Sequence, residues 1–130
     1  MSSDLQTLFV NLAEKERIKG HHSPEGRAIR TLSRALNGWV AGSLFGKDVL
    51  VLCEQALADW LETRLKLSAW STLGTGELAA VAAAQGLITD TEAADLKRIS
   101  AARSRLRDQV DARDVEDALE FCIHLVEKHW

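Results

Sequence analysis

Basic residues that could bind phosphate gather in one short stretch of the chain. Five of the eleven residues from 97 to 107 carry a positive charge: Lys97, Arg98, Arg103, Arg105 and Arg107. Four of them, Arg98, Arg103, Arg105 and Arg107, are the candidate RNA-binding residues, because arginine forms charged, forked hydrogen bonds with phosphate. Asp95 and Asp108 flank the stretch. The alternative interpretation is a solvated helix face whose charges pair with neighbouring acids.

Arg103 stands out within this stretch because of its place in an apolar pattern. Leu96, Ile99, Leu106 and Val110 are spaced by three and four residues through position 103, which predicts one core-facing helix stripe. A guanidinium in the interior must meet a carboxylate or water. One interpretation is therefore an ion pair with Glu54 or Glu62 on an earlier helix. The other is an arginine that lines the cleft of a binding or catalytic site.

Metal and thiol chemistry are not indicated. His21 and His22 are adjacent in a turn and have no further ligands at metal-binding spacing, so we expect neither a metal nor a cofactor. Cys53 and Cys122 both fall in apolar helical stripes, which predicts buried free thiols in a reducing compartment. We therefore expect a cytoplasmic protein.

The elements that must position these residues are predicted to be helices. Apolar residues at a spacing of three and four predict helices over about 3–19, 24–36, 47–67, 77–85, 89–109 and 111–127. Thr89 and Glu92 have the spacing of a capping box, and Gly86 suits a helix C-terminus. No segment shows the alternation typical of a strand. The predicted fold class is all-α, a four- or five-helix up-down bundle.

Length and composition predict one domain over residues 1–130, in which 1–46 form N-terminal helices and a junction and 47–128 form the core bundle. The net charge of −3 removes any whole-molecule attraction for nucleic acid, so an RNA site must be local. No apolar run approaches the roughly 18 residues of a membrane span, and the N-terminus lacks the pattern of a secretory signal.

Three segments resemble the HEPN superfamily of small helical bundles. They are the run from Val51 to Leu57, the turn Gly86-Leu87-Ile88-Thr89, and the stretch Ala94–Ile99 that leads into Arg103-Ser104. The resemblance covers about residues 47–128. In that family, a long helix rich in alanine, leucine and glutamate precedes a turn of this type. The next helix carries an Arg-Asn pair, with a histidine about five residues after the arginine.

The resemblance implies an activity that this sequence does not fully support. Active members are metal-independent ribonucleases in which the arginine and histidine of two subunits meet in a dimer cleft. Here the pair reads Arg103-Ser104, the residue five positions later is Asp108, and no histidine lies between His22 and His124. An aspartate is ionised near neutral pH and would repel the phosphate. Arg103, Ser104 and Asp108 are therefore candidates for a degenerate motif, not confident catalytic residues.

The sequence accordingly predicts a non-catalytic or degenerate HEPN-like binding or regulatory module that acts on RNA or a protein partner and is related to toxin–antitoxin systems. Trp39, Trp70 and Trp130 lie at element ends, where exposed rings often mark interfaces, and are compatible with self-association. The resemblance implies a homodimer, because HEPN-like domains commonly pair through such bundles. One alternative is a weak metal-independent ribonuclease that uses Arg103. The other is a purely structural protein-interaction domain.

Sequence-specific reading of DNA is not expected. The short helix, glycine turn and second helix between residues 77 and 99 have the order of a helix-turn-helix motif. However, Asp90, Glu92 and Asp95 occupy the start of the helix that would enter the groove, where they would face phosphates.

Overall fold

Regularly spaced apolar residues fold this chain into helices. The computed structural model describes residues 7, 9–10, 13–14, 17, 24–65, 74–105 and 109–128. Within these residues the elements are α2 (Pro24–Val40), α3 (Gly46–Arg64), α4 (Thr75–Ala84), α5 (Asp90–Arg103) and α6 (Ala112–Lys128). The described residues before Pro24 are also helical, and none of the described residues lies in a strand. The predicted all-α class is confirmed.

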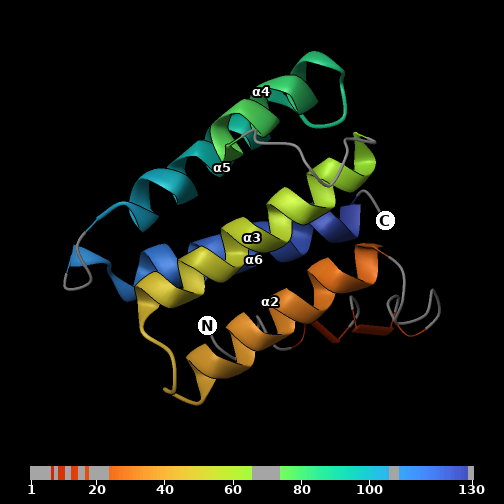
Figure 1. Cartoon of the computed structure of the whole chain (residues 1–130). Helices are drawn as coiled ribbons and strands as arrows, with labels where there is room; N and C mark the ends of the chain where they lie inside the picture. Colours follow the sequence, from red (N-terminus) through yellow and green to blue (C-terminus); the bar gives the residue numbers. More distant parts are fainter. Residues whose placement is uncertain are drawn as a thin grey trace.

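The two most central helices are α3 and α6. In Figure 1, α3 crosses the molecule in front of α6, with α2 along one side and the pair α4 and α5 along the other. Helices α2 and α3 run in opposite directions, as do α5 and α6 (Figure 1). The side chains of Leu57, Trp60 and Leu61 on α3 and of Leu119 and Ile123 on α6 are fully buried. They belong to one apolar core, to which α2 also contributes.

Helix α2 continues past the point where the sequence predicted its end. The apolar spacing predicted a helix over about 24–36, but α2 runs through Asn37 and Gly38 to Val40. Gly38 is kept inside the helix because the Leu44 side chain packs against it, and a Cβ at that position would collide with Leu44. The prediction was wrong because glycine here provides space for a neighbour and does not end the helix.

Helix α5 begins as predicted and ends earlier than predicted. The Thr89 hydroxyl accepts a hydrogen bond from the backbone N–H of Glu92 at 3.1 Å, and the Glu92 carboxylate accepts one from the N–H of Thr89 at 2.9 Å. This confirms the capping box. The turn before it contains Gly86 at a φ of 74°, in the left-handed region that glycine adopts readily.

At its other end, α5 stops at Arg103 and not near Gln109, and Ser104 forms its C-cap. Arg103 is therefore the last residue of a helix and not the middle of a long inward stripe. Leu106 and Asp108 lie outside the described residues, while Val110 packs half-buried against the core. The three-and-four spacing of apolar residues continues past the end of α5, so the spacing by itself did not reveal where the helix ends.

Both cysteines are free and fully buried, as the sequence predicted. Trp60 lies in the core and Trp39 is half-buried, whereas Trp70 and Trp130 lie outside the described residues. In the described part of the chain, no helix has both the length and the apolar character needed to cross a membrane.

Candidate functional site

Arg103 pairs with Glu54. The last residue of α5 lies beside the middle of α3, and its Nε atom contacts the Oε2 atom of Glu54. The Glu54 side chain is only 12% exposed, whereas 42% of the Arg103 side chain is exposed. Of the two glutamates expected as partners, the structure places Glu54 at this arginine. Glu62 lies eight residues further along α3, about 12 Å away along the helix axis.

The exposure of Arg103 follows from the early end of α5. As the last residue of α5, Arg103 keeps part of its side chain in solvent while its Nε edge meets the shielded carboxylate of Glu54. This arrangement combines the two interpretations of the sequence, because the arginine is paired and still lines a surface hollow. That hollow is bounded by Val51, Glu54, Gln55, Ala58 and Arg103.

The other described arginines of the basic stretch also face carboxylates. The Nη2 atom of Arg98 lies 3.1 Å from Oδ1 of Asp95, one turn earlier on α5. The Nη1 atom of Arg105 donates a 2.9 Å hydrogen bond to Oδ2 of Asp114 on α6. Lys97 is exposed, and Arg107 lies outside the described residues. The predicted phosphate-binding face is thus largely neutralised by acids of the same chain.

The three residues of the degenerate motif do not form a catalytic arrangement that the structure describes. The Ser104 hydroxyl donates a 3.1 Å hydrogen bond to the backbone carbonyl of Ser100, so its proton is used at the end of α5. Asp108 lies outside the described residues. His124 is exposed on α6 and lies 3.8 Å from a carboxylate oxygen of Glu120. It lines neither the hollow beside Arg103 nor the groove between α5 and α6 that is described next.

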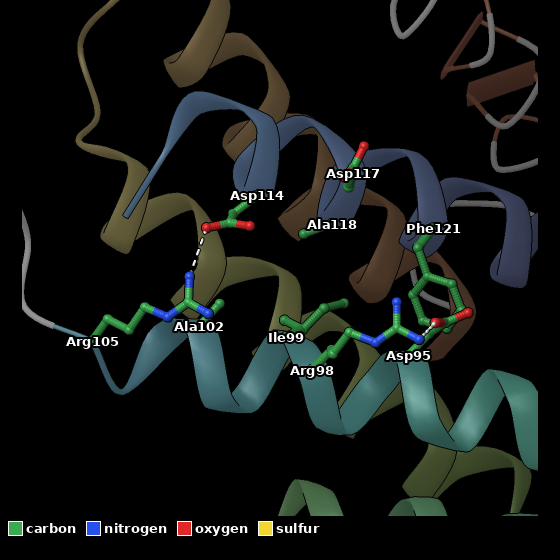
Figure 2. A pocket seen from close by; sticks show the side chains of 9 residues that line it. All are labelled: Asp95, Arg98, Ile99, Ala102, Arg105, Asp114, Asp117, Ala118 and Phe121. Atoms are coloured by element: carbon green, nitrogen blue, oxygen red, sulfur yellow. Dashed lines mark hydrogen bonds and ion pairs between the residues drawn. The ribbon is translucent and has the colours of Figure 1, made fainter. Parts of the chain in front are cut away.

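A groove of about 310 Å³ lies between α5 and α6, and no sequence pattern predicted it. Figure 2 shows the Arg105–Asp114 hydrogen bond spanning the two helices at one end and Phe121 at the other. Apolar side chains, those of Ile99, Ala102 and Ala118, lie between these ends (Figure 2). The small size of the two alanines keeps this part of the helix pair open.

Charged side chains surround the apolar part of this groove. Arg98 and its partner Asp95 extend from α5, and Asp117 on α6 points away from α5 (Figure 2). The side chain of Asp117 is 63% exposed. The Nε atom of Arg113, one turn earlier on α6, lies 3.9 Å from Oδ2 of Asp117. An apolar floor with paired charges at its rim can bind an amphipathic surface, but it presents no activated nucleophile.

No metal-binding constellation is found among the described residues: nowhere in them do three or more His, Cys, Asp or Glu side chains lie together in an arrangement for a metal ion. Three further arginines, Arg27, Arg30 and Arg34, are exposed on α2. These arginines belong to α2, whereas Arg103 belongs to α5.

The chain was compared with protein-family models, with curated proteins and with solved structures, and none of the three comparisons found a match. The HEPN resemblance therefore stays a prediction from the residues quoted above.

Proposed function

We propose that this protein is a non-catalytic HEPN-like module that works by binding a protein partner. The observation that carries this proposal is the pairing of the basic stretch: Arg98 with Asp95, Arg103 with Glu54, and Arg105 with Asp114. Each pair removes one positive charge from the surface that RNA would have to contact. A protein surface requires no such excess of charge, because its interfaces combine apolar contacts with a polar rim.

The chemistry of the motif region supports the absence of catalysis. Metal-independent RNA cleavage needs groups that accept and donate protons beside the phosphate. The Ser104 hydroxyl donates its hydrogen bond to the Ser100 carbonyl, and the sequence has no histidine between His22 and His124. Arg103 by itself could stabilise negative charge but could not move a proton, because a guanidinium keeps its protons at any ordinary pH.

An RNA cleavage and binding assay without metal, at low and high salt, tests the proposal. We expect no cleavage, and no salt-sensitive binding that Arg103→Ala removes. Arg113→Ala is the matched control, since Arg113 is an arginine outside the basic stretch that also lies beside an acid, Asp117. Metal-independent cleavage that disappears in Arg103→Ala, and persists in Arg113→Ala, would instead establish the weak ribonuclease.

A further inference from the structure

The hollow beside Arg103 combines a fork of hydrogen-bond donors with apolar walls. It has a volume of about 260 Å³. Four of its five lining residues, Val51, Glu54, Gln55 and Ala58, belong to two successive turns of α3, and Arg103 approaches from α5. Val51 is 41% exposed, which is unusual for an aliphatic side chain beside an ion pair. The hollow therefore offers a charged group, an amide and aliphatic carbon within one small space.

Arg103 retains binding capacity after it has met Glu54. The ion pair is made through Nε, whereas a guanidinium carries four further N–H groups on its two Nη atoms. With 42% of the side chain exposed, the guanidinium remains accessible from the hollow. Planar N–H forks of this kind match the two oxygens of a carboxylate and bind them in parallel.

The neighbouring Glu54 decides which anion suits this fork. The Glu54 carboxylate already offsets the positive charge of Arg103. A second anion therefore gains only the hydrogen bonds that the Nη groups of Arg103 can donate, and Glu54 repels it. The repulsion grows with the charge of the ligand, and a phosphate monoester carries about −1.5 to −2 near neutral pH. A carboxylate with a single negative charge is therefore favoured over phosphate.

The size of the hollow restricts the ligand further. Pockets for drug-sized molecules have volumes of about 300–1,000 Å³, so a volume of about 260 Å³ suits a single amino-acid residue better than a nucleotide. A C-terminal residue carries its carboxylate and its side chain on the same carbon. The carboxylate can meet Arg103 and the Gln55 amide while an apolar side chain contacts Val51 and Ala58.

We propose that this hollow binds the C-terminal carboxylate of a partner polypeptide whose last residue is apolar. Capture of a chain end by a cluster of donors is an established mode of peptide recognition. The inference rests on the proposed function, since it names the chemistry of the partner that the module would hold. Val51, Gln55, Ala58 and Arg103 form the binding site, and Glu54 selects a singly charged ligand.

Titration of the whole protein with N-acetyl-leucine, followed by NMR, tests this site. The matched probe is N-acetyl-leucinamide, which has the same side chain but no carboxylate, and inorganic phosphate is the competing anion. We expect saturable shifts of the Val51 methyl and Gln55 side-chain amide signals with N-acetyl-leucine. N-acetyl-leucinamide should bind at least about tenfold more weakly, because it lacks the carboxylate that the Arg103 fork would hold. Phosphate should also bind at least about tenfold more weakly, because Glu54 repels its larger charge.

Variants separate binding from folding. Arg103→Gln should weaken N-acetyl-leucine binding about tenfold or more, whereas Arg98→Gln on the same helix should leave it unchanged. Glu54→Gln keeps the shape of the hollow and removes its negative charge, so it should bind N-acetyl-leucine more tightly and admit phosphate. The double variant Glu54→Gln/Arg103→Gln leaves no unpaired carboxylate behind, and it should fold but not bind.

Equal binding of N-acetyl-leucine and N-acetyl-leucinamide would overturn the proposed site. The absence of any shift with either probe at 50 mM, about ten times a Kd of roughly 5 mM, would also overturn it. Preference for phosphate in the natural protein would also overturn it. None of these outcomes would affect the proposed function, which fails if the protein cleaves RNA through Arg103 or binds RNA in a salt-sensitive way that Arg103→Ala removes. The two proposals can therefore fail separately.

Discussion

Arg103 forms an ion pair with a shielded carboxylate on another helix. The Glu54 side chain is 12% exposed, and the guanidinium supplies a positive charge beside it. Removing one member of a buried pair leaves the other charge without compensation, which is more costly than the net worth of the pair. The partial exposure of Arg103 lowers that cost, because water can replace some of its interactions.

The change Arg103→Ala should therefore lower the free energy of unfolding by about 2 kcal/mol, less than the roughly 3–5 kcal/mol found on breaking fully buried pairs. Urea denaturation measures it. In the double variant Glu54→Gln/Arg103→Ala the loss should be smaller than in Arg103→Ala, because no carboxylate is stranded. An unchanged midpoint for Arg103→Ala would show that the pair has no structural role.

The thiol of Cys122 should make stability fall at alkaline pH. Burial raises the pKa of this thiol well above its usual range, and the neighbouring Cys53 adds to the shift. The unfolded thiol loses its proton first, above about pH 8.5, so the native state then binds more protons and stability decreases as pH rises. Denaturation at pH 7 and pH 9.5 measures this. Cys122→Ala should show a flatter dependence, and an equally steep one would assign the effect to other groups.

At the scale of elements, local signals predicted helix starts better than helix ends. Helix α5 begins at its capping box because Thr89 and Glu92 satisfy each other's backbone N–H groups, a device contained in four consecutive residues. The ends of α2 and α5 depend on other segments. Leu44 folds back onto Gly38, and the chain turns after Arg103 toward α6, so neither end could be read from periodicity.

The change Thr89→Ala should cost about 1 kcal/mol, because the Glu92 N–H loses its acceptor at the start of α5. For a chain of this length the Tm should fall by roughly 3–5 °C. Thr91→Ala is the matched control, since Thr91 is the same residue type in the first turn of the same helix and is exposed. A similar fall in both variants would show that the cap itself contributes little.

At the scale of the whole molecule, each of the three described arginines of the basic stretch, Arg98, Arg103 and Arg105, meets a carboxylate of the same chain. Ion pairs link α5 to α3 through Glu54 and to α6 through Asp114, and both lie near the C-terminal end of α5. These contacts hold the end of the helix between its neighbours. The groove between α5 and α6 lies beside the Arg105–Asp114 pair, whose two residues help to line it.

The proposed homodimer is testable by dilution. We expect sedimentation velocity to show a dimer at micromolar concentration that dissociates toward nanomolar concentration, as an interface with a polar rim would. High salt should weaken the dimer if paired charges at the groove take part. A monomer across the whole range would remove the dimeric cleft and leave a single-chain binding module.

The sequence by itself determined the helical class, most helix starts, the capping box and the burial of both cysteines. These features depend on residues within about one or two turns of each other, so the spacing of apolar and capping side chains is sufficient to predict them. It also named Arg103 as exceptional and proposed Glu54 and Glu62 as its partners. It could not decide between them, because either glutamate could face α5.

Only the tertiary structure decided that Glu54 meets Arg103, that α5 ends there, and that Asp114 meets Arg105. It also brought Ala102 of α5 and Ala118 of α6 into the lining of one groove. Each of these facts joins side chains that belong to different helices. Their positions depend on how the helices pack and turn, a property of the whole core that no local pattern contains.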